Sequence, residues 1–327
     1  MNLKSRLALL REQSGVISGR QLQEQKADLR VRLERMQTGA RERMTTRKQL
    51  SEDDLAGQLD GEVIAESLVL VEERFQLNHK HGLQSLESLV RHECTLPGID
   101  TPEPHKLLFM DTETTGLSGG SGTLVFMLGL ARMEDTELVL RQYLLTAFAG
   151  EKMMFEHCAQ WLSGDETLVT FNGKSIDVPL LATRSRMVRV EDLFGRLDHI
   201  DLLHPVRRAF RSQWPECRLG TAENKLLGFE RVDDLSGAEA PGAWFDWIRY
   251  GNPIRLAGVL KHNRWDIISL AALLPLLSRV YGSPGEWNAD AFSITQAWIR
   301  SGDELTALRL LEASKERLSI RGWKGLA

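Results

Sequence analysis

The sequence predicts an α/β fold in which a β-sheet is flanked by α-helices. From residue 106 onward, short apolar runs and amphipathic stretches follow one another in the order βββαβα, and several helices come after the last strand. Turn signals such as Asn172-Gly173 separate these stretches. The length of 327 residues and a hydrophobic share of 42% leave room for one large domain or two smaller ones with a substantial core.

Each element can be placed along the chain. Strands are predicted over 106–111, near 123–132 and near 137–146, then a helix near 151–163, a strand over 167–171, a helix from about 178 and a strand ending at 199–201. Before them, "EVIAESLVLVEERF" (62–75) is predicted as a strand, and after them residues 293–318 are predicted as a helical hairpin with Gly302 and Asp303 at its turn.

The chain is expected to contain four segments. These are a basic, partly helical or disordered arm (1–57), a small attached element and linker (58–104), the main domain (105–283) and a C-terminal helical, repeat-like segment (284–327). Pro97, Pro102 and Pro104 mark the linker.

Charge is distributed unevenly along the chain. The net charge of −4 excludes a wholly basic coat protein for nucleic acid, yet residues 1–50 carry 12 Lys and Arg against 5 Asp and Glu. This arm could contact phosphates, or it could be a solvated helical extension. The sequence leaves both interpretations open.

The cysteines and the longest apolar runs indicate a soluble protein of the reducing cytoplasm. Cys94, Cys158 and Cys217 are scattered and have no CxxC spacing, which argues against a disulfide framework, a zinc site or a redox pair. The apolar runs at 124–131 and 270–277 are much shorter than the roughly 20 residues that span a bilayer. No membrane partner is therefore expected.

Acidic residues stand at unusual places. In "LLFMDTETTGLSGGSGT" (107–123), Asp111 and Glu113 follow an apolar strand directly, although burying an unpaired carboxylate costs several kcal/mol. Asp177 follows the strand and turn of "TLVTFNGKSIDVPLL" at the expected start of a helix, where it could also be an ordinary cap.

A third acidic patch lies on a predicted core helix. Its apolar stripe consists of Leu256, Leu260, Ile267, Leu270, Leu274 and Leu277. His262 and Asp266 are four residues apart and share one helix face, a spacing that also occurs in simple surface hydrogen bonds. Asn263 is polar but lies on the apolar stripe, so it needs a buried partner.

Together the patches contribute four carboxylates, and nothing in the sequence pairs them with nearby cations. Divalent metal ions would offset the cost of gathering them. Carboxylate oxygens suit Mg²⁺ or Mn²⁺, and two such ions about 3.5–4 Å apart are used for in-line displacement at phosphorus. The sequence therefore predicts a site for two divalent ions.

Five blocks of sequence, in order, resemble a known family. They are "FMDTETTGLSGGSGTLVFMLGLA", "FNGKSIDVPLL", "HIDLLHPVRR", "RLGTAENKLLGFERVDDLSGAEAP" and "KHNRWDIISLAALL". In sequence and order they resemble the YprB-type ribonuclease H-like domain, a branch of the DEDD exonuclease superfamily that includes DnaQ-like and B-family polymerase proofreading domains. The resemblance covers residues 106 to about 280 and implies a ribonuclease H-like mixed β-sheet flanked by helices.

The resemblance also implies roles for individual residues. Asp111, Glu113, Asp177 and Asp266 would be the DEDD metal ligands, with Asp111 bridging two ions. His262 would be the general base that takes a proton from water, and the product would be a nucleoside 5′-monophosphate. One departure stands out, because His262 occupies the spacing at which one subgroup has tyrosine, and Lys261 stands where the other subgroup has histidine.

Nucleic-acid contacts are expected near these acids and on a following helix. The candidates are Thr112, Asn172, Lys174, Arg207, Arg208 and Arg211. Phe210 and Trp214 could stack on bases, or they could be core residues of an amphipathic helix. The glycine-rich loop 116–123 lacks the G-K-[ST] of a nucleotide-binding P-loop, and Asp201 is interpreted as a structural cap rather than a fifth catalytic acid.

The function expected from the sequence is a metal-dependent nuclease, specifically a 3′–5′ exonuclease acting on single-stranded DNA or 3′ tails. RNA trimming, structure-specific endonuclease cleavage and a non-catalytic accessory role in nucleic-acid binding are the alternatives. The resemblance also suggests a helicase partner, because an exonuclease needs unwound ends.

Overall fold

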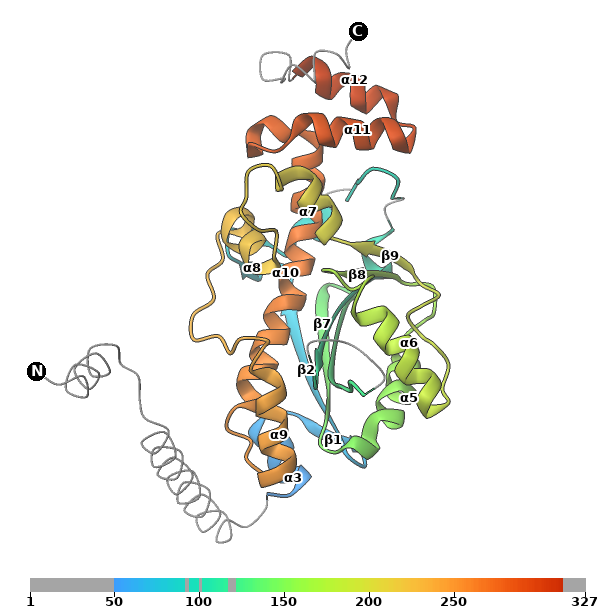
Figure 1. Cartoon of the computed structure of the whole chain (residues 1–327), viewed down its shortest axis with the longest axis vertical. Helices are drawn as coiled ribbons and strands as arrows, with labels where there is room; N and C mark the ends of the chain where they lie inside the picture. Colours follow the sequence, from blue (N-terminus) through green and yellow to red (C-terminus); the bar gives the residue numbers. More distant parts are fainter. Residues whose placement is uncertain (1–49, 92–93, 100–101, 117–121, 314–327) are drawn as a thin grey trace, which may run out of the picture. The chain divides into compact units, whose positions relative to one another are not determined.

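A computed structural model describes residues 50–91, 94–99, 102–116 and 122–313 (Figure 1). The predictions for the arm up to residue 49, for most of the glycine-rich loop and for the end of the C-terminal hairpin lie outside these residues.

A seven-stranded mixed sheet forms the centre of the described chain. Its order is β1-β2-β7-β6-β5-β8-β9. The strands are β1 (Glu62–Ala65), β2 (Leu68–Gln76), β5 (Leu107–Thr114), β6 (Val125–Glu134), β7 (Glu137–Leu145), β8 (Thr167–Thr170) and β9 (Asp198–Asp201). The pairs β5/β8 and β8/β9 are parallel, and the other neighbours are antiparallel. A two-stranded sheet of β3 (Lys80–His81) and β4 (Gln84–Ser85) lies apart from it.

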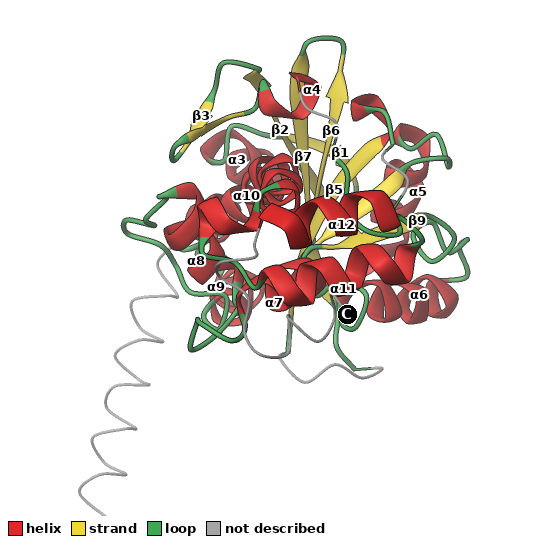
Figure 2. Ribbon diagram, turned by 90° about the horizontal axis from the view of Figure 1, so that it is seen from above, coloured by secondary structure: helices red, strands yellow, loops and turns green. Residues whose placement is uncertain are grey.

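Helices cover both faces of the sheet (Figure 2). They are α3 (Glu52–Gln58), α4 (Ser88–Arg91), α5 (Glu151–Trp161), α6 (Asp177–Val188), α7 (Leu203–Phe210), α8 (Leu219–Ala222), α9 (Ala240–Tyr250), α10 (Leu256–Gly282), α11 (Ala291–Ser301) and α12 (Glu304–Ala313). Side chains alternate along β5, so that Phe109 packs in the cluster with Ile267 of α10, and Met110 in the cluster with Phe155 of α5. The predicted order βββαβα and the α/β fold class are confirmed.

One predicted strand is two strands. Residues 62–75, expected as one strand of an attached element, form the hairpin of β1 and β2, because Ser67 adopts a left-handed conformation with φ 61°. The prediction of a single strand was wrong, since its apolar pattern does not reveal a turn at Glu66 and Ser67. β2 pairs with β7 from Leu68 to Gln76, so this hairpin extends the main sheet.

Helix α10 is the central core helix. The apolar stripe predicted from the sequence is buried along its whole length, and Asn263 is fully buried within it. By length and composition alone α10 could cross a membrane, but 72% of its most apolar window is buried inside the fold. Its hydrophobicity is therefore explained by packing against the sheet.

The two ends of the described chain are folded. Residues 50–57 were grouped with the arm, but Ser51 and Asp54 form a capping box that starts α3, and Leu55 is fully buried. At the other end Gly302, with φ 87°, ends α11, and Asp303 accepts a hydrogen bond from the backbone N–H of Thr306. The described part of the predicted helical hairpin is thus confirmed.

No disulfide joins Cys94, Cys158 and Cys217, in agreement with their scattered spacing.

Candidate active site

The pleat of β5 places Asp111 and Glu113 on the face that α10 covers. Asp111 Oδ2 accepts a hydrogen bond of 2.8 Å from Nδ2 of Asn263, which belongs to α10. Thr112 points to the opposite face, where its hydroxyl donates to Asp177. The D-x-E spacing therefore directs two carboxylates to one side of the sheet, as the period of a strand requires.

Helix α10 brings His262 and Asp266 to the same place. They are one turn apart, with Nε2 of His262 3.5 Å from Oδ2 of Asp266. One ligand atom from each of Glu113, His262 and Asp266 lies within 4.8 Å of the other two. These three residues could hold a metal ion.

Asp177 begins α6 after the turn that follows β8. Asn172 in this turn adopts a left-handed conformation with φ 71°, in agreement with the predicted turn. The buried carboxylate of Asp201 accepts backbone N–H groups from Asn172, Lys174 and Leu203. Asp201 is therefore the structural cap that the sequence analysis preferred, and it holds the loop leading to Asp177.

The acids raise one another's pKa values. Removal from water is the first cause of the raised pKa of Asp111, Glu113, Asp177 and Asp266, and neighbouring carboxylates add to it. Only 6% of Glu113 is exposed, and no hydrogen bond or ion pair joins its side chain to another described residue. The cluster is short of cations.

One cation does reach the cluster. Arg231 donates to Asp266, pairs with Glu223 at 2.7 Å and lies 3.2 Å from Asp234. These partners raise its pKa, although burial opposes them. No role for these residues was predicted from the sequence. Glu223 begins the helical turn Glu223–Leu227, and Arg231 and Asp234 lie on the loop after it, so only the packing of this segment against α10 places them at the site.

Glu223 anchors this arginine from inside the protein. Only 1% of it is exposed, and the hydroxyl of Ser269 donates to it. His81 lies 2.7 Å from the same hydroxyl, and burial lowers the pKa of His81 to about 4, so this ring is neutral at pH 7. The sequence around Glu223 gives no signal of a buried ion pair, because Asn224 and Lys225 follow it directly and make the stretch resemble a solvated one.

Asp234 orients the ring of His262. Its Oδ2 atom lies 2.8 Å from Nδ1 of His262 and 3.2 Å from Nη1 of Arg231. Nη1 of Arg231 also lies 3.1 Å from Nδ1, so this nitrogen has a carboxylate oxygen and a guanidinium donor beside it. The carboxylate is the nearer of the two and only accepts, which favours the tautomer with the proton on Nδ1. In the neutral ring Nε2 is then an acceptor that faces Asp266.

Lys261 is held elsewhere. Its ammonium group donates to the carbonyl oxygens of Val232 and Asp233 and lies 4.5 Å from the ring centroid of Trp265. Of the two residues that depart from the subgroup patterns, His262 is thus the one whose side chain lies among the acids.

A family model of the RNase_H superfamily matches residues 108–278, which include all four acids and His262. This match extends over more than half of the chain. The chain belongs to the ribonuclease H superfamily.

The chain is similar to two known proteins. The chain is 32% identical over 272 residues to the uncharacterized protein YprB of Bacillus subtilis (strain 168), and the match covers 77% of this chain but only 64% of YprB. A family B DNA polymerase from the hyperthermophilic archaeon Pyrobaculum calidifontis matches with a TM-score of 0.43 and 15% identity, over 64% of this chain and 30% of the polymerase. A TM-score of 0.43 does not support a fold assignment. The assignment rests on the family match and on the sheet topology.

The candidate nucleic-acid contacts lie in two separate places. The hydroxyl of Thr112 is engaged by Asp177, and Asn172 and Lys174 lie in the loop before Asp177, where their backbone N–H groups donate to Asp201. Arg207, Arg208 and Arg211 lie on or just after α7. Arg208 contacts the hydroxyl of Tyr281, which is 15 residues beyond Asp266 on α10, or about 22 Å along the helix axis. The structure therefore does not bring Arg208 to the acids.

The two aromatic residues near these arginines stack on each other. The ring centroids of Phe210 and Trp214 are 4.2 Å apart, and Phe210 is 1% exposed. The interpretation of Phe210 as a base-stacking platform was wrong. The alternative prediction, that Phe210 is a core residue of an amphipathic helix, agrees with its position at the end of α7.

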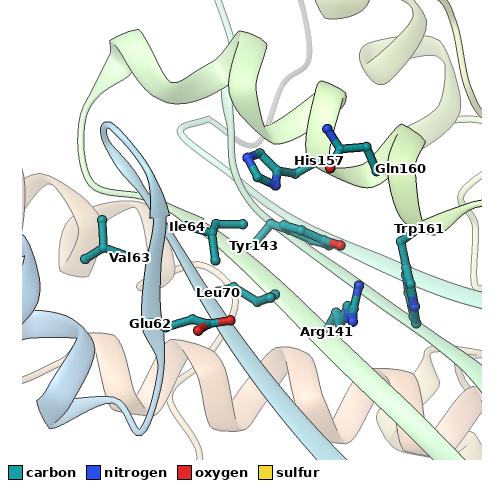
Figure 3. A pocket seen from close by; sticks show the side chains of 9 residues that line it. All are labelled: Glu62, Val63, Ile64, Leu70, Arg141, Tyr143, His157, Gln160 and Trp161. Carbon is teal, nitrogen blue, oxygen red and sulfur yellow. The ribbon is translucent and has the colours of Figure 1, made fainter.

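A pocket of about 500 Å³ lies away from the acids, between β1 and α5 (Figure 3). Arg141, Tyr143, His157 and Trp161 contribute to its lining. Arg141 is paired with Glu72 at 2.8 Å and lies over the ring of Trp161. None of the predicted site residues lines this pocket, so the candidate active site remains the acidic cluster.

Replacing Arg231 with methionine should destabilise the metal-free protein by about 3–5 kcal/mol, the usual cost of leaving a buried charge without its partner. Glu223 is the charge left behind. Urea unfolding in EDTA measures the change. Arg231→Met combined with Glu223→Gln should recover part of the loss, and Arg196→Met, which breaks an exposed pair with Glu191, should change little. Equal stability of Arg231→Met and the wild type would contradict a structural role for the pair.

Proposed function

We propose that this protein is a metal-dependent nuclease, and specifically a 3′–5′ exonuclease on single-stranded DNA or 3′ tails. The observation that carries the proposal is the meeting of Asp111, Glu113, Asp177 and Asp266, with His262, at one edge of a ribonuclease H-like sheet. A buried acidic cluster that contains an unpartnered carboxylate is costly unless it serves to bind cations.

The donor set fits divalent metal ions. Asp111, Glu113, Asp177 and Asp266 would hold two Mg²⁺ or Mn²⁺ ions through carboxylate oxygens, which both ions accept. The raised pKa values of Asp111 and Glu113 and the unpartnered side chain of Glu113 support this, whereas Asp266 is already paired with Arg231. When bound, such ions supply Lewis acidity that lowers the pKa of water and stabilises charge on the leaving oxygen.

Side chains of this protein would accept the proton that the attacking water loses. His262 has its Nδ1–H committed to Asp234, so Nε2 is the atom that would take a proton from the attacking water. Asp234 would stabilise the imidazolium that results. Arg231 would keep Asp266 in place, because it binds both that acid and Asp234.

The substrate we propose is single-stranded DNA. A helicase partner follows from the family resemblance, and a cytoplasmic location from the scattered cysteines and the short apolar runs. RNA trimming and endonuclease cleavage would use the same acids. The non-catalytic alternative is disfavoured by the presence of all four carboxylates together with an oriented histidine.

Degradation of DNA and RNA strands labelled at the 3′ or 5′ end tests the proposal. With Mg²⁺ or Mn²⁺, 5′-labelled single-stranded DNA should shorten stepwise from its 3′ end, and EDTA should stop the reaction. Internal fragments would favour an endonuclease, and attack on RNA alone would favour trimming. Binding without cleavage under every metal condition would overturn the proposal.

Deleting residues 1–49 should weaken DNA binding and flatten its salt dependence, if the basic arm contacts phosphates. Each phosphate contact adds a slope of about −0.9 to log K against log salt. These residues lie outside those the structure describes, and the cut leaves α3 intact. Fluorescence anisotropy at several salt concentrations measures the slope, and turnover of saturating short substrates should survive. An unchanged slope would favour a solvated extension.

A further inference from the structure

Three residues form one row across the central strands. The strand register pairs Asp111 of β5 with Gly129 of β6, and Gly129 with Gln142 of β7. Asn263 of α10 lies over the middle of this row and is fully buried. Its side chain bridges from Gln142 to Asp111 across the glycine between them.

The bridge consists of hydrogen bonds with a fixed direction. Nε2 of Gln142 donates to the carbonyl oxygen of Leu260 at 2.9 Å and to Oδ1 of Asn263 at 2.8 Å. A carbonyl oxygen only accepts, so the nitrogen of Gln142 must face α10. The oxygen of Asn263 then faces Gln142, and its nitrogen is left for Asp111 Oδ2, at 2.8 Å.

Gly129 makes this approach of α10 to the sheet possible. A Cβ atom at residue 129 would stand 2.1 Å from Oδ1 of Asn263 and 2.4 Å from Cδ1 of Ile267. Any other side chain would push the helix, and the asparagine with it, away from β6. The glycine inside this strand therefore has a specific use, which is to admit a polar bridge.

We propose that Asn263 is a positioning residue for Asp111, and that Gln142 acts through it. The amide of Asn263 holds Oδ2 of Asp111 and so fixes the orientation of the whole carboxylate. The other oxygen of Asp111 would then be available to a metal ion, with its orientation already set before the ion binds. This inference rests on the proposed function, since it takes Asp111 as a metal ligand. Asp111 and Gln142 are thus the buried partners that Asn263 needs as a polar residue on the apolar stripe of α10.

Calorimetric titration of the full chain with Mn²⁺ tests the inference without reference to activity. Asn263→Leu keeps the volume but cannot donate, and we expect it to bind Mn²⁺ roughly 10–100-fold more weakly, the usual effect of removing a partner of a metal ligand. Ile268→Ala is the control, because Ile268 is 2% exposed on the same helix. It should lower the melting temperature and leave Mn²⁺ affinity unchanged.

A double-mutant cycle separates positioning from packing. Gln142→Met should weaken Mn²⁺ binding less than Asn263→Leu does, and the double variant should bind no more weakly than Asn263→Leu alone. Unchanged affinity in Asn263→Leu, or additive losses in the double variant, would overturn the inference. A wild-type protein that binds Mn²⁺ but cleaves no nucleic acid would overturn only the proposed function.

Discussion

Asp111→Ala should abolish nucleic-acid hydrolysis while the protein remains folded, and Asp266→Ala should do the same. Both carboxylates belong to the cluster whose raised pKa values reflect burial and mutual repulsion. Because the groups of such a site act as a unit, removal of one member costs nearly as much rate as removal of several. End-labelled DNA incubated with Mg²⁺ or Mn²⁺ measures the effect.

The stability of Asp111→Ala provides a second measurement with a defined pH dependence. The raised pKa of Asp111 means that its charged form destabilises the folded state. Above that raised pKa the variant should therefore be as stable as the wild type or more stable, in metal-free buffer. As the pH falls through the raised pKa and below the ordinary aspartate value, the advantage should disappear, because the wild-type carboxyl is then protonated.

Asp165→Ala is the matched control for these experiments. Asp165 is an exposed acid paired with Lys106 at 3.0 Å, away from the cluster, and its loss should leave activity intact. Full hydrolysis by Asp111→Ala, or full wild-type activity in EDTA, would contradict the two-metal site.

The positions of the acids could be predicted because each depends on a local rule. The period of a strand places Asp111 and Glu113 on one face, and the i, i+4 rule of a helix places His262 beside Asp266. The parallel pairing of β5 with β8 then brings Asp177 to the same edge of the sheet. The local rules fix which acids share a face, whereas the β5–β8 pairing and the packing of α10 on the sheet bring the three groups together.

The positions of Arg231 and Asp234 at the candidate site could not be predicted from local rules. Both lie on the loop after α8, and their partners Asp266 and His262 are 35 and 28 residues away in sequence. Their charges resemble those of any solvated loop. Only the packing of this loop against α10 turns them into parts of the candidate site.

Asn263 was an intermediate case. Its place on the apolar stripe of α10 indicated a buried partner, and this expectation was correct. The partner itself could not be predicted, because it depends on the register that places Gly129 between Asp111 and Gln142. The short turn between β6 and β7 fixes their register, but β5 and β6 are joined by a longer loop, so the residue opposite Asp111 could not be read from a turn.

His262→Ala should lower the rate of hydrolysis by roughly 10²–10⁴-fold, the usual contribution of a general base. Nε2 of His262 faces Asp266, and Asp234 fixes the ring through Nδ1. DNA binding should change little, because it does not rely on this proton transfer. His105→Ala, at an exposed histidine remote from the acids, is the control and should keep the wild-type rate.

His262→Tyr distinguishes a chemical role from a structural one. Tyrosine at this spacing reproduces the pattern of the tyrosine subgroup that the sequence resembles, and its hydroxyl extends further from the backbone than Nε2 does. Partial activity of His262→Tyr beside an inactive His262→Ala would mean that a proton-accepting or water-orienting group is required at this position of α10. Near-wild-type rates of His262→Ala would instead show that no imidazole is needed. In that case the Asp234–His262 contact would serve only to hold the loop after α8 against α10.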